Sequence, residues 1–414
     1  MSLIKPFCGL RPAESRAADV AAPPYDVVDR NEAKALASGR PWSFLHISRP
    51  EIDLPDNVDP YDASVYSKGR ENLDHMIAEG VLVRDAQPCY YAYRLTMGSH
   101  VQTGLVATAS VEAYDNDRIK KHEFTRPVKE DDRVRQIDTL NAQTGPVFLV
   151  YKADAAVDAV LRAVSSEVPE IDVVVERDRV RHELWPICDG GTITALTAAF
   201  EAMPAIYVAD GHHRSAAGSR VGNARRAANA AHTGDESYNH FLSVIFPHDQ
   251  MQILDYNRVV ADLNGRGRDD FLAAVAEGFD LEISADPVKP AHSGEFGMYL
   301  DGQWYRLQIH DERIPVDDPV GRLDVSLLQA NLIEPLLGVD DPRRDDRIDF
   351  VGGIRGLRAL EQRVDEGRWA VAFALYPTTM QALMDVADAG EVMPPKSTWF
   401  EPKLADGLVS HVLD

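Results

Sequence analysis

The sequence predicts an α/β or α+β fold in which helices flank mixed sheets. Segments with strand-like and helix-like patterns alternate along all 414 residues, which is typical of domains that pack helices against a sheet. Hydrophobic residues make up 45% of the chain, and this is enough for a sizeable core. Because one domain usually holds about 100–200 residues, the length predicts two or three domains.

The first elements are two helices and a pair of strands. Asp29 and Glu32 have the spacing of a capping box and predict the start of a helix. A second helix is predicted to end at Gly80, because glycine is common just after the last turn of a helix. Residues 89–96 and 103–111 are rich in aromatic and β-branched side chains, so we expect two strands joined by the turn between them.

The same alternation continues through the rest of the chain. Further predicted strands cover 146–151, 205–209, 241–246, 347–351 and 369–376, and further predicted helices cover 194–203, 215–231, 271–279 and 357–367. Asp301 and Gly302 predict the turn of a hairpin.

The chain is strongly acidic. It has 66 Asp and Glu residues against 43 Lys and Arg residues, which gives a formal net charge of −23. Proteins bind nucleic-acid backbones and anionic membranes mainly through Lys and Arg, so we expect neither nucleic acid nor membrane as a partner. A small anionic substrate in one local basic pocket remains compatible with this charge. The sequence also allows a homodimer.

Cysteine usage and hydropathy predict a cytoplasmic protein. Cys8, Cys89 and Cys188 are odd in number and far apart in sequence, so we expect no disulfide scaffold. No window approaches about 18 uninterrupted apolar residues, and the first residues lack the apolar core of a signal peptide.

The strongest chemical signal lies between a predicted strand and a predicted helix, where the chain reads Asp210-Gly211-His212-His213-Arg214. The unpaired N–H groups at a helix N-terminus favour anions, and the glycine lets a ligand approach the backbone closely. The histidines and the arginine add donors suited to phosphate or carboxylate. Asp210 can hold a divalent cation, orient a histidine or act as a base. A helix cap alone would need only the aspartate.

A second candidate segment reads KKHEFTRP, and its cationic residues surround Glu123. In a strand, the side chains would alternate: one face would carry Lys121, Glu123 and Thr125, and the other His122, Phe124 and Arg126. Glu123 is then a candidate general base whose pKa is set by its cationic neighbours, and Lys121, His122 and Arg126 are candidate phosphate-binding residues. The alternative is a solvated charged strand, since charge runs are usually surface features.

A third candidate segment lies in a proline-rich stretch near the C-terminus. Lys396, Ser397 and Thr398 could bind phosphate there, and the two aromatic residues that follow could stack on a base. The glycines and the following helix of a Walker A motif are missing. A loop packed by its aromatic residues is the alternative.

Histidine and aspartate side chains also allow a transition-metal hypothesis. The candidate ligands are His122, His212, His213, His248 and Asp210. The chain has no HExxH motif and no spaced Cys/His set, so the spacing itself does not indicate zinc. The absence of a GxSxG elbow and of a GxGxxG turn argues against an α/β-hydrolase and a Rossmann dehydrogenase.

Across its length the chain resembles the prokaryotic DUF1015 family. The motifs that carry the resemblance are IKPF, GLRP, AAPPYDVV, FLHISRPE, KKHEFTRP, ADGHHRSAA, FPHDQMQILDYNRVV, DFVGGIRGL and MPPKSTWFEPKL. The ADGHHR element by itself also resembles the signature of the ParB/sulfiredoxin-like superfamily, and most closely that of its free serine kinases.

This second resemblance implies a fold, a site and cofactors. It implies a ParB/sulfiredoxin-like core over 116–260, with an α/β region before it (1–115) and another after it (261–414). It places Asp210 as a functional, metal-binding residue. It also implies that ATP or ADP with Mg²⁺ is bound and that the residues from Gly211 to Arg214 lie at the phosphates. The catalytic glutamate of those kinases has no secure match, and Glu123 is the candidate.

Three hypotheses follow from these features. The first is a nucleotide- and Mg²⁺-dependent phosphotransferase or phosphatase that acts on a small hydroxylated or phosphorylated metabolite, with serine or phosphoserine as a guess. The second is a metal-dependent hydrolase that uses no nucleotide. The third is a ParB-like nucleotide-binding regulatory protein, against which the net charge speaks.

Overall fold

The computed structural model describes residues 2–175 and 177–414, and they form two compact units. The first unit comprises the chain up to Met251 together with Pro402–Asp414, and the second comprises Gln252–Glu401. The expected boundary between 260 and 261 lies a few residues beyond this division. The expected boundary between 115 and 116 falls inside the first unit, because its strands pair in one sheet with strands from both sides of that point.

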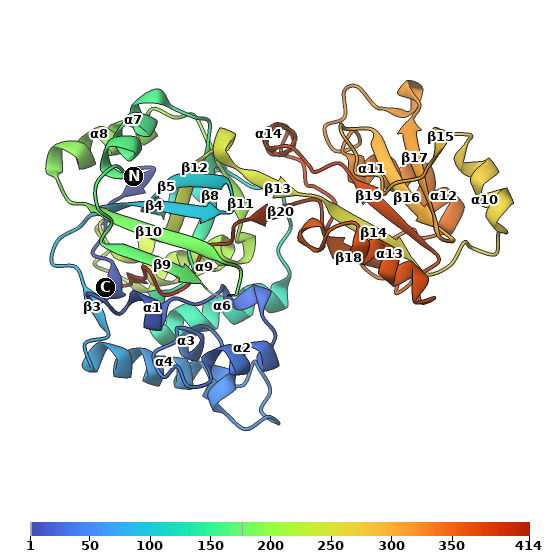
Figure 1. Cartoon of the computed structure of the whole chain (residues 1–414). Helices are drawn as coiled ribbons and strands as arrows, with labels where there is room; N and C mark the ends of the chain where they lie inside the picture. The colour runs from blue at the N-terminus through green and yellow to red at the C-terminus, as the bar shows by residue number, and fades with distance from the viewer. Residues whose placement is uncertain (1, 176) are drawn as a thin grey trace. The chain divides into compact units, whose positions relative to one another are not determined.

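A mixed sheet of nine strands forms the centre of the described part of the first unit (Figure 1). Its order is β6-β11-β8-β12-β5-β4-β10-β9, with β1 paired to β5. The strands are β1 (Ile4–Lys5), β4 (Tyr90–Met97), β5 (His100–Ser110), β6 (Ile119–Lys120), β8 (Val147–Tyr151), β9 (Ile171–Val175), β10 (Val180–Ile187), β11 (Ile206–Asp210) and β12 (His240–Pro247). Strand β11 is parallel to β6, β12 is parallel to β8, and the other pairs are antiparallel. The predicted α/β architecture with mixed sheets is confirmed.

Helices pack around this sheet. They are α1 (Ala17–Val20), α2 (Arg30–Ala37), α3 (Leu45–Ser48), α4 (Ala63–Ala78), α5 (Val111–Asp115), α6 (Pro127–Leu140), α7 (Ala155–Val164), α8 (Gly190–Glu201) and α9 (His212–Ala228). Figure 1 shows α7 and α8 above the sheet and the group α2, α3, α4 and α6 below it. Helix α6 packs on both α9 and α4. Two short strand pairs complete the unit, β2 (Leu10–Pro12) with β3 (Leu82–Arg84) and β7 (Ala142–Gln143) with β21 (His411–Val412).

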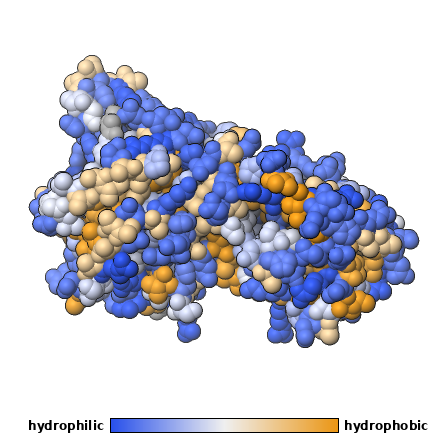
Figure 2. Space-filling view, turned by 90° about the horizontal axis from the view of Figure 1, so that it is seen from above, coloured by the Kyte–Doolittle hydropathy of each residue, from blue (hydrophilic) through white to orange (hydrophobic). Residues whose placement is uncertain are grey.

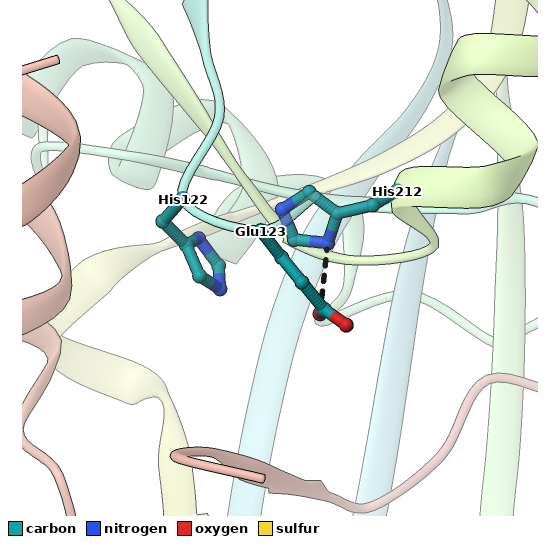
Figure 3. A group of neighbouring side chains, drawn as sticks. All are labelled: His122, Glu123 and His212. Atoms are coloured by element: carbon teal, nitrogen blue, oxygen red, sulfur yellow. Dashed lines mark ion pairs between the residues drawn. The ribbon is translucent and has the colours of Figure 1, made fainter. Parts of the chain in front are cut away.

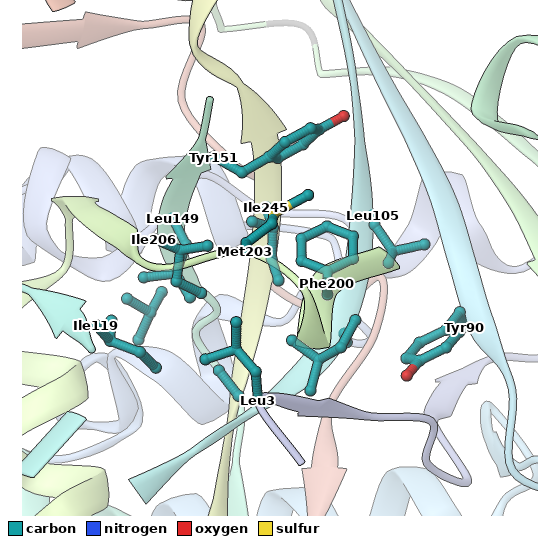
Figure 4. Close-up of a cluster of buried hydrophobic side chains, with 14 of the residues drawn as sticks. Leu3, Tyr90, Leu105, Ile119, Leu149, Tyr151, Phe200, Met203, Ile206 and Ile245 are labelled. Carbon is teal, nitrogen blue, oxygen red and sulfur yellow. The ribbon is translucent and has the colours of Figure 1, made fainter. Parts of the chain in front are cut away.

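A large buried cluster packs the sheet against α7 and α8 (Figure 4). Leu149 and Ile245 contribute from the sheet, and Leu161 and Phe200 contribute from the two helices. Each large aliphatic or aromatic side chain that leaves water stabilises the fold by about 1.5–3 kcal/mol. The strands that carry the candidate site, β6 and β11, are anchored in the same cluster through Ile119 and Ile206.

Local signals predicted several element boundaries correctly. The Asp29 side chain accepts a hydrogen bond from the Glu32 N–H, and Glu32 accepts one from the Asp29 N–H, so the predicted capping box is present. Gly80 follows α4 with a φ of +66°, as expected for a glycine that ends a helix. Strands β4 and β5 pair as the predicted hairpin.

The second unit is an antiparallel sheet with short helices. The sheet order is β15-β17-β16-β19-β14-β18. Its strands are β14 (Tyr256–Val260), β15 (Phe279–Ser284), β16 (Glu295–Leu300), β17 (Gln303–Ile309), β18 (Ile348–Gly352) and β19 (Val371–Leu375). Asp301 and Gly302 join β16 to β17 in the predicted hairpin. The other elements are β13 (Gln252–Leu254), β20 (Trp399–Glu401), α10 (Arg268–Val275), α11 (Asp324–Leu328), α12 (Glu334–Leu337), α13 (Arg358–Asp365) and α14 (Met380–Asp388).

Two of the three cysteines are bonded to each other, contrary to the sequence-based expectation. Cys89 and Cys188 form a disulfide with a Cα–Cα distance of 4.6 Å, and Cys8 is free. The sequence does not predict this pair, because the two cysteines are far apart along the chain. In the structure β4 and β10 bring Tyr90 opposite Ile187, and this places the adjacent Cys89 and Cys188 side by side.

The surface carries many polar side chains (Figure 2). The face shown in Figure 2 is predominantly hydrophilic. Among the described residues, no helix combines the length and the apolar character needed to cross a bilayer.

Candidate functional site

The site is built around the turn from β11 into α9. Asp210 is the last residue of the strand, and Gly211 precedes the helix with φ of +92° and ψ of 30°. This left-handed conformation favours glycine. No side chain caps the described start of α9, a helix of 17 residues. Its first backbone N–H groups and the positive end of its dipole are therefore placed to meet an anion.

Asp210 is held by a lysine from the segment that returns to the first unit. The Lys403 Nζ donates to Asp210 Oδ2 at 2.8 Å, and both side chains are largely buried. Burial favours the neutral acid, but the charges of Lys403 and Arg214 outweigh it and hold the pKa of Asp210 well below its usual range. Asp210 is therefore a carboxylate at neutral pH.

His122, Glu123 and His212 lie together beside this turn (Figure 3). The Glu123 Oε2 is 3.6 Å from His212 Nδ1, and the two imidazole rings meet edge to face with centroids 4.5 Å apart. One possible ligand atom from each of the three residues lies within 4.8 Å of the other two. The histidines are buried and Glu123 is half-exposed, so the group is open on the carboxylate side.

Both buried histidines are neutral at physiological pH. Burial lowers the pKa of His122 to about 4, although the nearby Asp210 acts in the opposite direction. Burial and the neighbouring His122 ring lower the pKa of His212 well below its ordinary value. His122 Nδ1 and His212 Nε2 are buried and have no hydrogen-bond partner among the described residues. A neutral imidazole nitrogen without a partner can accept a proton or bind a metal ion.

His213 has a different environment from His212. Its Nε2 accepts a hydrogen bond from the backbone N–H of Arg126 at 3.0 Å. Burial and the charge of Arg126 lower its pKa. This contact ties the start of α9 to the segment that carries Glu123, so His213 has a positioning role in this structure.

Arg214 points away from Glu123 toward the segment that contains Tyr25. It donates to the carbonyl of Pro146 and lies 3.6 Å from Asp26, with Nε buried and without a hydrogen-bond partner among the described residues. Arg214 also borders a cavity of about 30 Å³, which is large enough for water.

Asp406 lines the same cavity. It is almost fully buried, and its Oδ1 has no hydrogen-bond partner in the described part of the chain. Burial raises the pKa of Asp406 to about 7, although the positive charge of Arg214 opposes this. The carboxyl therefore changes its charge near neutral pH.

The expected alternation of side chains along 121–126 is wrong. Only Ile119–Lys120 form a strand, and the following residues turn so that His122 is buried while Phe124 is 77% exposed. Lys121 donates to the carbonyl of Tyr114 at 2.9 Å and pairs with Asp117. Its ammonium group therefore points toward α5. Arg126 contacts the site through its backbone N–H, which donates to His213.

Lys396, Ser397 and Thr398 belong to the second unit, whereas the β11–α9 turn belongs to the first. Lys396 lies over the ring of Tyr256, and Ser397 donates to the carbonyl of Pro394 at 2.6 Å. These contacts agree with a loop packed within its own unit, and a phosphate-binding role for the three residues stays a prediction. His248 accepts a hydrogen bond from the Ala153 N–H and lies outside the group of His122, Glu123 and His212.

Sequence reasoning gave no individual role to three residues that contact the turn or its neighbours, although Asp26 and Lys403 lie in segments that were weak or open candidates. Lys403 pairs with Asp210, Asp26 lies near Arg214, and Asp406 lines the cavity. Asp26 lies in the motif PPYD, and Lys403 and Asp406 lie in FEPKLAD. Nothing in the spacing of these motifs indicates that they come close to the β11–α9 turn. The return of residues 402–414 to the first unit brings Lys403 and Asp406 into place.

A family model described as "Protein of unknown function (DUF1015)" matches residues 4–326. The chain belongs to the DUF1015 family. The match covers both KKHEFTRP and ADGHHR, so the residues of the β11–α9 turn lie inside the DUF1015 region. No curated protein compared with this DUF1015 chain matches it.

Several solved structures share a general likeness with this DUF1015 protein. A free serine kinase mutant in complex with AMP is 14% identical, with a TM-score of 0.36 over 73% of this chain and 92% of the kinase. Another mutant in complex with ADP is also 14% identical, with a TM-score of 0.35 over 75% of this chain and 95% of the kinase. A conserved hypothetical protein from Pyrococcus furiosus is 14% identical, with a TM-score of 0.34 over 76% of this chain and 97% of that protein.

Proposed function

We propose that the protein is a nucleotide-dependent phosphotransferase or phosphatase that acts on a small hydroxylated or phosphorylated metabolite. The observation that carries the proposal is the start of α9, which no side chain caps among the described residues. There a left-handed glycine lies between an ionised Asp210 and the first N–H groups of a 17-residue helix. Phosphate groups bind well at such helix starts. The ADGHHR resemblance to free serine kinases supports the same placement.

The local charges at the turn suit phosphate although the chain as a whole is acidic. Lys403 and Arg214 are both within the first unit and both act on Asp210. Phosphoryl transfer depends mainly on positioned cations and hydrogen-bond donors around the phosphate oxygens. The backbone N–H groups at Gly211 supply hydrogen-bond donors, and the side chain of Lys403 supplies a cation.

Glu123 is the residue proposed to move the proton. Its carboxylate lies beside His212 and is half-exposed, so it can reach a hydroxyl group on a bound metabolite. A general base must come within hydrogen-bonding distance of that proton. The neutral His212 would orient Glu123, and His213 would fix the segment through its contact with the Arg126 N–H.

ATP or ADP and Mg²⁺ are the cofactors that this function implies. Mg²⁺ prefers oxygen ligands, and the Asp210 carboxylate offers them, although its Oδ2 is engaged by Lys403. The bound ion would neutralise charge on the phosphate oxygens. Arg214 and Lys403 would then share the remaining negative charge.

A thermal-unfolding screen with ATP, ADP and phosphorylated metabolites, with and without Mg²⁺, tests the proposal. A ligand at about 100 times its Kd should stabilise the protein by about 2.7 kcal/mol. The Asp210→Asn variant should stay folded and lose turnover, whereas Asp56→Asn, which alters an exposed aspartate paired with Lys34, should retain it. Full turnover in Asp210→Asn, or no shift with any nucleotide, would contradict the proposal.

A further inference from the structure

We propose that His122, Glu123 and His212 form a binding site for one divalent transition-metal ion, with zinc as the reference ion. The three side chains come from the segment after β6 and from the first turn of α9, and they converge in Figure 3. Two imidazoles with one carboxylate leave coordination positions open for water or substrate. The inference does not depend on the proposed function.

The spacing of the three residues is close to that of a zinc site. Zinc–nitrogen and zinc–oxygen bonds of about 2.0–2.2 Å place the ligand atoms of a tetrahedral ion about 3.3–3.6 Å apart. The Glu123 Oε2 and the His212 Nδ1 already lie 3.6 Å apart. All three candidate ligand atoms lie within 4.8 Å of one another, so small rotations of the side chains suffice to close the site.

His122 has the hydrogen-bonding pattern that is typical of a metal-binding histidine. Metal-binding histidines usually bond through one ring nitrogen to a backbone or carboxylate group while the other nitrogen holds the ion. The His122 ring is bonded to the backbone of Val208, and its Nδ1 is buried without a hydrogen-bond partner among the described residues. A buried polar atom without a partner is unfavourable, and a metal ion would supply the missing partner.

The ligand types and the local charge favour a transition metal over Mg²⁺. Imidazole suits zinc, iron, copper and nickel, whereas Mg²⁺ is bound through oxygen atoms. Two neutral imidazoles leave the charge of Glu123 to balance the ion. Two of the nearby positive charges have a carboxylate beside them, since Lys403 pairs with Asp210 and Arg214 lies near Asp26.

An ion at this place would change the role of Glu123. The carboxylate would be a metal ligand instead of the general base. A water molecule bound to the ion would supply hydroxide, because a divalent ion lowers the pKa of its water. A bound phosphate ester would meet this water from the open side of the group, and the water would replace the alcohol that leaves. The site would therefore support hydrolysis as well as proton abstraction.

Metal titration of the chelator-treated full chain, without nucleotide, tests the proposal. By calorimetry we expect one Zn²⁺ per chain and a much weaker response to Mg²⁺, and Co²⁺ should give visible absorption bands typical of nitrogen and oxygen ligands. His122→Ala and Glu123→Gln should weaken Zn²⁺ binding beyond the about 10–100-fold that loss of an outer partner causes. The matched control is His248→Ala, which removes a histidine outside the group and should keep wild-type affinity.

The outcomes separate cleanly. Circular dichroism checks that each variant is folded, and Glu123→Gln, which keeps the side-chain volume, serves if His122→Ala does not fold. Absence of stoichiometric Zn²⁺ binding by the wild type overturns the proposal, as does wild-type affinity in either folded ligand variant. A response to Mg²⁺ equal to that for Zn²⁺ also overturns it. Nucleotide binding in the thermal screen bears only on the proposed function.

Discussion

Asp210 and Lys403 are 193 residues apart in sequence and form an ion pair of 2.8 Å at the start of α9. The pair joins the strand-to-helix turn to the segment that returns from the second unit. It keeps Asp210 ionised in a largely buried place, and it sets a cation beside the helix N-terminus. Both effects can be measured by removing the lysine.

Lys403→Met should destabilise the protein and weaken anion binding. Loss of the lysine leaves the Asp210 carboxylate without its closest cation, and removing one partner of a part-buried pair costs roughly 1–3 kcal/mol. Chemical denaturation measures this cost. Lys34→Met is the control, because its pair with Asp56 is exposed and should be worth no more than about 1 kcal/mol. An equal loss of unfolding free energy in the two variants would show that the Asp210–Lys403 pair stabilises the protein no more than an exposed pair does.

Gly211→Ala should lower both stability and phosphate affinity. The residue has a φ of +92°, and an added Cβ would lie 3.2 Å from the Arg214 Nε, so we expect a cost on the order of 1–2 kcal/mol. Gly190→Ala is a matched control at the start of α8, where a Cβ meets nothing within 4 Å and φ is ordinary. That change should be neutral or slightly stabilising. An unchanged melting temperature in Gly211→Ala would argue against the strained turn.

Asp406 should make stability fall as the pH rises toward neutrality. An unfolded aspartate ionises near 3.8, whereas folded Asp406 keeps its proton up to about pH 7. Between these values the folded chain binds more protons, so the free energy of unfolding decreases with pH. The stabilisation is fully present below about pH 4 and is lost as the pH passes through 7, with a ceiling of about 4 kcal/mol.

The measurement is the difference in unfolding free energy between wild type and Asp406→Asn at several pH values from 4 to 8. The asparagine cannot titrate, so contributions from other groups cancel in the difference, including those of the nearby Arg214, Arg133 and Asp26. Asp235→Asn, at a side chain that is 90% exposed, gives the baseline. A difference that does not change with pH would exclude a raised pKa at Asp406.

Reduction of the Cys89–Cys188 disulfide should lower stability. The bond joins residues 99 apart, and losing a native disulfide typically costs 2–5 kcal/mol, chiefly through the unfolded chain in the entropic account. Cys188→Ser should reproduce the effect of reductant, and Cys8→Ser, at the free cysteine, should not. Thiol titration under denaturing, non-reducing conditions should find one free thiol, and three would refute the pairing.

The sequence predicted features that depend on neighbouring residues better than those that depend on distant contacts. The Asp29–Glu32 capping box and the Asp301–Gly302 hairpin were correct because each rests on a few adjacent side chains. The strand-to-helix turn at Asp210 and Gly211 was found for the same reason. The alternation expected along 121–126 failed because tertiary contacts, such as that of Lys121 with Tyr114, override the local pattern.

The candidate site was predicted in part. The two motifs that carry Glu123 and His212 do meet, which the sequence could only suggest. The Cys89–Cys188 pair and the contact of Lys403 with Asp210 could not be predicted, since each depends on how strands and chain segments far apart in sequence come together. Neither the periodicity nor the spacing of residues in a sequence shows which distant segments come into contact.

The first unit is discontinuous in sequence, and this has a consequence for synthesis. A ribosome makes the residues up to Met251 first, then all of Gln252–Glu401, and only afterwards the segment that carries Lys403 and Asp406. Until then β7 lacks its partner β21, and Asp210 lacks its lysine. A chain released early could therefore build most of the central sheet, but its β11–α9 turn would lack these partners until translation has passed the second unit.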